Sequence, residues 1–219
     1  MIWTQPFELP LIRHVAEAII ADIVGPAGLQ FGDHYVAKAP TLFGSVGLSI
    51  TKVRASVTDL TVLKASAGGH GISFSVGTGR AQGSTALTLL TIGGLLCQEL
   101  VHQKQCGRDP TSFAMAAAVQ TDWSANKPPH PSPEEWLRGY LGTVYEFEAH
   151  AEQVACELWL ADTISGVSPR KSERLSAVTQ SEPLRRIRER LIPSGTPSAL
   201  VVQWFDLLET KMNEALGGW

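Results

Sequence analysis

A run of fourteen uncharged residues, TALTLLTIGGLLCQ at positions 85–98, constrains the fold of this chain more than any other stretch. The run stays apolar for three helical turns, and a helix that is apolar nearly all round is buried in a protein core. A helix that spans a bilayer needs about 20 apolar residues, so this run is too short to cross a membrane. We therefore expect a buried central helix that becomes polar near its C-terminal end.

The pattern of apolar and polar residues in the rest of the chain predicts helices at both ends and strands in between. Apolar residues at helical spacing between residues 11 and 23 predict a first helix, and alternating runs between residues 42 and 77 predict two to four strands. The segment 111–120 is a short helix candidate, a long helix is expected from Pro133 to about residue 162, and two further helices follow. Because the strands form one block, we predict an α+β fold with a small, mainly antiparallel sheet.

Length and composition limit the number of domains and the classes of function that the chain can have. The 219 residues suit one compact domain, which we expect to comprise residues 1–165, with residues 166–219 as a C-terminal helical extension packed on it. A net charge of −3 and a pI near 6.1 argue against a nucleic-acid partner. Three cysteines without a C-x-x-C pair argue against a disulfide framework, and the N-terminus lacks a secretory signal. We therefore expect a cytoplasmic protein that does not associate with membranes.

Polar side chains on the two central helices need an explanation. Gln98, Glu99 and His102 share one face of the buried helix, within an arc of roughly 100°. Such a spacing also arises on solvated helices, but polar groups that emerge from a buried helix need partners. On the long helix, Glu148 lies within the apolar arc, so it should be paired, protonated or bound to a metal. The opposite side has the pattern of a solvated face and consists of Glu146, His150, Gln153 and Glu157.

Two segments resemble a known family. QELVHQKQ, residues 98–105, resembles the H-E-L-[VI]-H-x-x-Q segment of small H-E-x-x-H zinc peptidase-like proteins, the minigluzincin-type zincins common in bacterial and phage genomes. YLGTVYEFEAHA, residues 140–151, is similar to the Y-L-x(4)-E-x-E-A-x-A segment that follows it in some of them, with Tyr140, Glu146 and Glu148 at the family's spacing. The resemblance covers about 20 of the 219 residues and implies a zincin-like fold.

The resemblance also implies roles for the polar side chains. In that family two histidines of the first helix and a glutamate of the second bind Zn²⁺, and a further glutamate activates the attacking water. Carried over by position, His102 and Glu148 would be zinc ligands and Glu99 the general base, with Glu146 left open as the alternative to Glu148. Gln98 replaces the first histidine and offers only a neutral oxygen, a poor zinc ligand. His150 is not expected to replace it, because the helical wheel puts it about 160° from Glu148.

Three outcomes stay open from the sequence: a weak or altered metal site, a site completed by a distant histidine, or a fold retained without catalysis. The distant histidines are His14, His34, His70 and His130. The chain is accordingly either a zinc-dependent hydrolase of peptide or amide bonds, or an inactive binding or assembly protein with a buried polar network. Its partner is a peptide or protein substrate in the first case and a protein in the second. A glycine-rich turn at 77–83 is a poorer candidate for nucleotide binding, because no Walker lysine follows it.

Overall fold

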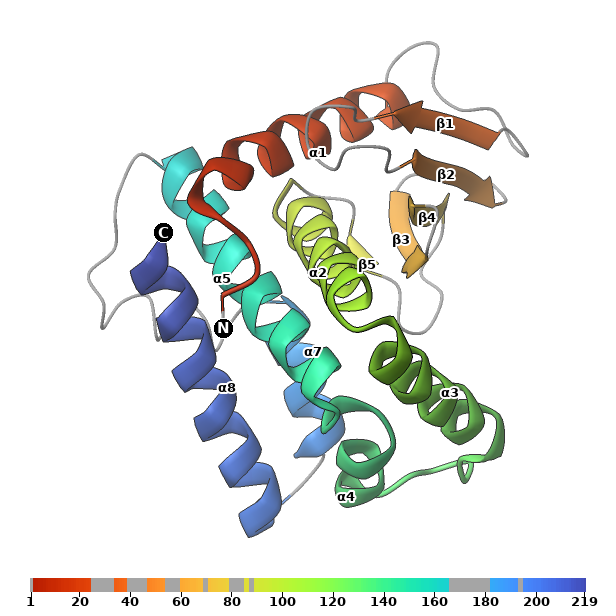
Figure 1. Ribbon diagram of the computed structural model, residues 1–219, viewed down its shortest axis with the longest axis vertical. Helices are drawn as coiled ribbons and strands as arrows, with labels where there is room; N and C mark the ends of the chain where they lie inside the picture. The colour runs from red at the N-terminus through yellow and green to blue at the C-terminus, as the bar shows by residue number, and fades with distance from the viewer. Residues whose placement is uncertain are drawn as a thin grey trace.

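Helices build most of the molecule (Figure 1). The computed structural model describes residues 2–24, 34–38, 47–53, 60–68, 71–78, 85–86, 89–165, 182–192 and 195–219. Its helices are α1 (Leu9–Val24), α2 (Leu89–Arg108), α3 (Pro110–Asn126), α4 (Pro133–Trp136), α5 (Val144–Ser165), α7 (Glu182–Leu191) and α8 (Ala199–Gly218). A 3-10 turn, η1 (Pro6–Glu8), precedes α1, and a π-helix, η2 (Leu137–Leu141), connects α4 to the start of α5. In this described part, no helix combines the length and apolarity that crossing a membrane requires.

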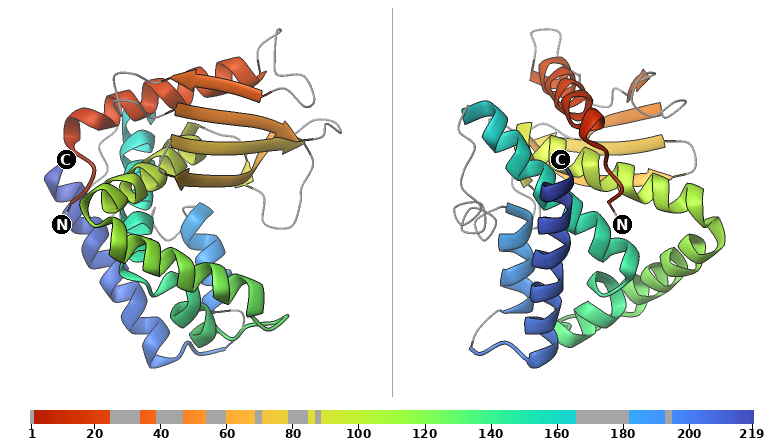
Figure 2. Two further views of the ribbon diagram at one scale, coloured as in Figure 1. Left: turned by 45° about the vertical axis from the view of Figure 1, so that its right-hand side comes forward. Right: turned by 60° about the vertical axis from the view of Figure 1, so that its left-hand side comes forward.

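Five short strands form one mixed sheet beside α1 and α2 (Figure 2). They are β1 (His34–Lys38), β2 (Gly47–Val53), β3 (Leu60–Gly68), β4 (Gly71–Thr78) and β5 (Thr85–Ala86), in the order β1-β2-β4-β3-β5. The central pair, β2 and β4, is parallel, with Ile50 opposite Phe74, and the other three pairings are antiparallel. Strands β3 and β4 lie against α2.

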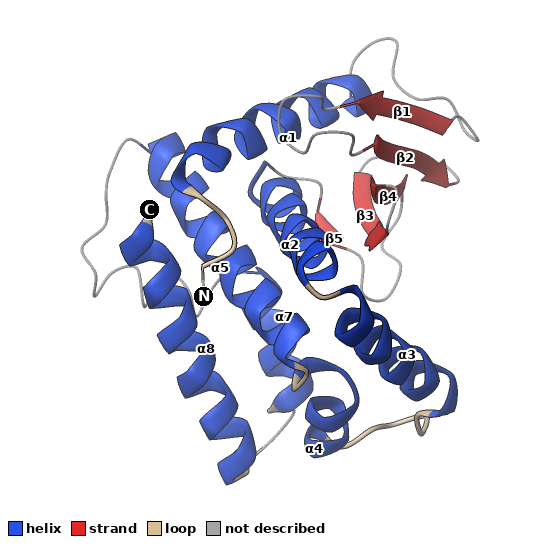
Figure 3. Ribbon diagram, viewed as in Figure 1, coloured by secondary structure: helices blue, strands red, loops and turns tan. Residues whose placement is uncertain are grey.

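The predicted fold class, a zincin-like α+β domain with a small, mainly antiparallel sheet, is wrong. Of the residues whose side chains the structure places, 85% are helical and none lies in a strand, because the strands are described by their backbone alone. Figure 3 shows these strands in red beside the more numerous helices in blue. The helical content exceeds the prediction partly because α3 is longer than the expected segment 111–120, starting at Pro110 with Asp109 as its cap. The alternating pattern of strands also does not specify their order, so the parallel β2–β4 pairing could not be predicted.

The predicted burial of the central helix is confirmed. Helix α2 begins at Leu89, and Ile92, Leu96 and Cys97 are fully buried among side chains of α1 and α5. Two glycines let α2 approach α5 closely: a Cβ added at Gly94 would lie 2.4 Å from Oε1 of Glu157, and one at Gly93 would lie 2.3 Å from a methyl carbon of α5. Among the described elements, α2 and α5 pack against each other most extensively.

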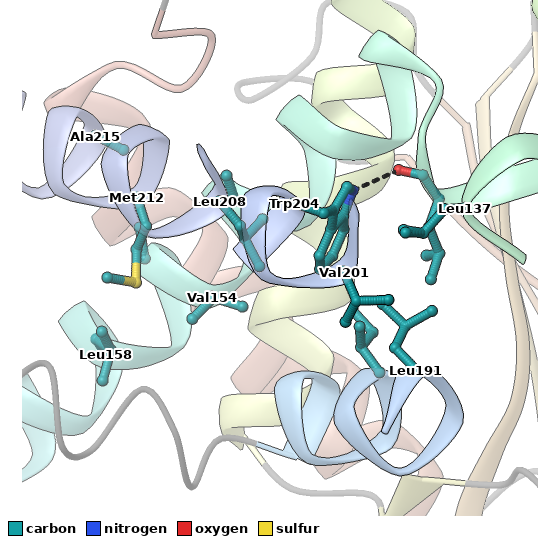
Figure 4. Close-up of a cluster of buried hydrophobic side chains, with 13 residues drawn as sticks. Leu137, Val154, Leu158, Leu191, Val201, Trp204, Leu208, Met212 and Ala215 are labelled. Atoms are coloured by element: carbon teal, nitrogen blue, oxygen red, sulfur yellow. Dashed lines mark hydrogen bonds between the residues drawn. The ribbon is translucent and has the colours of Figure 1, made fainter. Parts of the chain in front are cut away.

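A second core lies on the other side of α5, where α7 and α8 cover it (Figure 4). Helix α5 contributes its apolar arc, with Val154 and Ala155 fully buried, and α8 contributes Trp204 and Leu208. The indole nitrogen of Trp204 donates a hydrogen bond of 3.1 Å to the carbonyl oxygen of Leu141 in the π-helix. Because this apolar arc faces α7 and α8, the opposite face of α5 is turned toward α2.

Two sequence features fall largely outside the residues that the structure describes. Most of the glycine-rich turn at 77–83 lies there, since the description stops at residue 78 and resumes at residue 85. His70 also lies there, and for His34 the structure gives the backbone of β1 but not the side chain. The candidate site is therefore built from the helices.

Candidate functional site

The polar face of α5 is buried against the polar face of α2. Glu146, Gln153 and Glu157 are 6%, 4% and 6% exposed, and the side chain of His150 is 13% exposed. The prediction of a solvated face is therefore wrong. The physical reason is that α7 and α8 occupy the apolar side of α5, which leaves the polar side to meet α2. Helix α2 presents its own buried polar residues there, namely Gln98, Glu99, His102 and Gln105.

His102 is held in one tautomer by its neighbour on α2. Its Nδ1 lies 3.0 Å from Oε1 of Gln105. The amide nitrogen of Gln105 donates to the carbonyl oxygen of Tyr145 at 3.1 Å and to Oε2 of Glu148 at 3.3 Å, so the amide oxygen must face the imidazole. Because that oxygen can only accept, Nδ1 of His102 donates. Its Nε2 is turned to the carboxylate of Glu146, 3.7 Å from Oε1.

His150, one helical turn after Glu146 on α5, makes the same two contacts as His102, one with a glutamine and one with Glu146. Its Nδ1 lies 3.2 Å from Oε1 of Gln153, which again makes Nδ1 the donor. Its Nε2 lies 3.6 Å from Oε2 of Glu146. Within the described residues, neither this Nε2 nor this Oε2 has a hydrogen-bond partner, although both atoms are buried. The carboxylate of Glu146 therefore lies near the Nε2 atoms of both histidines.

The charges of the three side chains follow from their surroundings. Burial lowers the pKa of His102, but the adjacent Glu146 and the charge of Glu99 outweigh it and raise this pKa above its ordinary value. Burial raises the pKa of Glu146, but the contacts with His102 and His150 bring it below its ordinary value. For His150, burial outweighs the attraction of Glu146 and lowers the pKa. Glu146 is thus an anion beside one histidine that attracts a proton and one that stays neutral.

Helix α3 supplies a further contact to this cluster. The amide nitrogen of Gln120 donates to Oε1 of Glu146 at 3.1 Å and to the hydroxyl of Thr143 at 3.3 Å. The ring of Phe113, also on α3, lies 6.0 Å from the ring of His102. Sequence reasoning missed both residues, because nothing in the sequence of α3 indicates which side faces α2 and α5. Gln120 fixes the orientation of the carboxylate that lies between the histidines.

Glu99 and Tyr140 complete the surroundings of the cluster. Glu99 is buried on α2, and its charge raises the pKa of His102. Burial, followed by the charges of Glu146 and Glu99, raises the pKa of Tyr140, which therefore keeps its proton at neutral pH. Tyr140 lies in the π-helix η2, and π-helical turns occur frequently at functional sites. The sequence predicted Tyr140 as a site candidate but gave no sign of the π-helix.

Glu148, the predicted ligand, is turned toward the N-terminal segment instead. Its Oε2 accepts hydrogen bonds from the indole nitrogen of Trp3 at 2.8 Å and from Gln105 at 3.3 Å. The structure therefore brings Glu146, and not Glu148, to Nε2 of His102. The distant histidines His14 and His130 are exposed on the surface.

The side chains around Glu146 are of kinds that bind metal ions in proteins. Two imidazole nitrogens and one carboxylate oxygen are a ligand set found in catalytic zinc sites. As the side chains stand, no group of three or more histidine, cysteine, aspartate or glutamate residues in the described part is arranged to hold a metal ion. A scan against protein-family models and searches of curated proteins and solved structures find no match to the chain. The geometry of these side chains is thus the basis for assigning a function.

Proposed function

We propose that the chain is a zinc-dependent hydrolase of peptide or amide bonds, with His102 and Glu146 as metal ligands and Glu99 as general base. The observation that supports this most directly is the buried contact between Nε2 of His102 and the carboxylate of Glu146. Since Nδ1 of His102 already donates to Gln105, the unprotonated imidazole turns a lone pair toward an anion. A cation between the two groups, a proton or a divalent metal ion, removes this repulsion.

The chain's own residues supply the remaining functions. Glu99 lies one helical turn before His102 and, as general base, accepts a proton from the attacking water and transfers it to the leaving amine. Tyr140 stays protonated and can donate a hydrogen bond to the oxygen on which negative charge develops. Gln105 and Gln120 orient the two ligands, as outer partners do in metal sites. A bound zinc ion lowers the pKa of a water molecule and polarises the substrate carbonyl.

The proposed substrate is a peptide or protein, the class that the resemblance of residues 98–105 and 140–151 implies. We place the protein in the cytoplasm, which agrees with three free cysteines, Cys97, Cys106 and Cys156. The competing proposal is a binding or assembly protein, in which the same buried side chains form a hydrogen-bonded network without a metal. The hydrogen bonds of Gln105 with His102 and of Gln120 with Glu146 support this alternative, because they would belong to such a network.

Zinc content distinguishes the two proposals. The wild-type protein is purified without chelator, its zinc is measured by mass spectrometry, and hydrolysis of fluorescently labelled casein is followed. We expect close to one zinc ion per chain and hydrolysis that a chelator abolishes, with both lost in His102→Ala. The control is His14→Ala, which removes an exposed histidine on α1 and should leave both unchanged. A stable, metal-free wild-type protein that does not cleave casein after zinc is added would refute the hydrolase and support the binding protein.

A further inference from the structure

We propose that His150 is the third protein ligand of this metal site and takes the place of the histidine that is missing at position 98. The inference rests on the proposed function. It identifies the ligand that replaces the histidine absent at Gln98. The ligand set would be His102 from α2 together with Glu146 and His150 from α5. Helix α5 would then supply two of the three ligands, and its His150 would replace the ligand that α2 lacks.

The pairing of the two helices puts His150 at the right level. Helices α2 and α5 run antiparallel: Sγ of Cys97 contacts the carbonyl oxygen of Glu152 at 3.5 Å, and His102 contacts Glu146. Position 98 lies between these two levels on α2, so on α5 it corresponds to residues between 146 and 152. His150 falls within that interval. A histidine absent from one helix is thus present at the same height on the facing helix.

The distances between Glu146 and the two histidines are close to those between ligands of one metal ion. Two ligand atoms that each lie 2.0–2.2 Å from a tetrahedral zinc ion are about 3.4 Å apart. The Nε2 atoms of His150 and His102 lie 3.6 and 3.7 Å from the two oxygens of Glu146. Each histidine faces a different oxygen of Glu146. Both histidines can therefore bind the same ion if the carboxylate of Glu146 rotates or binds that ion through both of its oxygens. The described residues hold no ready-made three-residue arrangement, so binding one ion requires this adjustment.

Two buried polar atoms of His150 and Glu146 have no hydrogen-bond partner among the residues that the structure describes. These atoms are Nε2 of His150 and Oε2 of Glu146, and leaving buried polar atoms unsatisfied is unfavourable. The other ring nitrogen of His150 donates to Gln153, as the ring nitrogen of His102 donates to Gln105. A metal-binding histidine is held in this way, because the hydrogen bond on Nδ1 directs the Nε2 lone pair to the ion. Both histidines are thus prepared as ligands through Nε2.

Exchanging the histidine between the helices tests the proposal. Zinc affinity is measured by calorimetric titration for the wild type, His150→Gln, and the double variant Gln98→His/His150→Gln, with His14→Ala as the control. We expect His150→Gln to weaken zinc binding by more than about 100-fold, because the loss of an outer partner already costs 10–100-fold. The double variant should recover most of the affinity, since it returns a histidine to α2 at the same level.

A second measurement does not depend on the stability of the variants. In the zinc-loaded wild type, nitrogen NMR of the imidazole rings should show metal-shifted Nε2 signals for both His102 and His150, whereas the His14 signal should not move. If the wild type binds no zinc, the proposed function and this inference both fail. If it binds zinc and His102→Ala abolishes binding, but His150→Gln binds as tightly and the His150 signal does not shift, only this inference fails.

Discussion

Replacing Gly94 by alanine should destabilise the protein, because this glycine lets α2 and α5 touch. The new Cβ atom would lie 2.4 Å from Oε1, 2.6 Å from Cγ and 3.0 Å from Cδ of Glu157. The overlap includes the stem of that side chain, so Glu157 or the helix must shift, and such overpacking costs about 1–3 kcal/mol. Alanine recovers about 1 kcal/mol through its higher helix propensity. We expect a net loss of about 0–2 kcal/mol in the free energy of unfolding.

The matched control is Gly107→Ala on the same helix. A Cβ atom added at Gly107 meets nothing within 4 Å, so this variant should gain stability from helix propensity alone. Urea unfolding followed by tryptophan fluorescence should therefore place Gly94→Ala about 1–3 kcal/mol below Gly107→Ala. Zinc affinity should fall in the same order, since moving α2 away from α5 separates His102 from Glu146. Equal stabilities for the two alanine variants would show that the helices are not packed at this distance.

Three further predictions concern the site and the second core. Gln120→Ala should weaken zinc binding by about 10–100-fold in a calorimetric titration without abolishing it, because it removes an outer hydrogen bond from Glu146. Trp204→Phe should lower the free energy of unfolding by about 1–3 kcal/mol in urea, because the carbonyl oxygen of Leu141 loses its donor; an unchanged value would contradict this. In metal-free protein the raised pKa of His102 adds stability that is lost as pH rises above 6.5, and the lowered pKa of Glu146 adds stability that is lost as pH falls below 4.5. The contact therefore contributes fully between those values, and the difference in unfolding free energy between wild type and Glu146→Gln should be largest there.

The sequence predicted which helices matter but not how they face one another. The uncharged run at 85–98 indicated a buried helix, and α2 is one, because a helix without a polar side has no stable place at the surface. The wheel of α5 also put Val154, Ala155 and Leu158 on one side, and these are buried in the second core. It was the polar arc, however, that turned toward α2. That choice depends on α7 and α8 covering the apolar side, a tertiary contact that periodicity within one helix does not contain.

The same limit explains the outcome for the individual site residues. Its place on the apolar arc favours Glu148 as a ligand, yet its carboxylate accepts a hydrogen bond from Trp3, and Glu146 lies beside His102 instead. The angle between His150 and Glu148 on the wheel argues against His150 as a ligand, but His150 lies four residues after Glu146 and hence on the same face as that residue. Gln120 could be identified only once α3 was placed. The segment motifs thus indicated the two helices, while the identity of the contacting atoms required the packing.

The two buried thiols make the opening of the helix pair a measurable rate. Cys97 on α2 and Cys156 on α5 are buried, and their sulfur atoms contact backbone oxygens of the facing helix, Glu152 and Gly93. An alkylating reagent reaches them only when α2 and α5 separate, whereas the partly exposed Cys106 reacts without that step. The ratio of the two labelling rates then reports how often the unmodified protein opens at its centre. A metal ion that joins the helices should lengthen the mean time between openings by the factor 1 + c/Kd, where c is the free zinc concentration, so labelling provides a kinetic measure of ligation that needs no substrate.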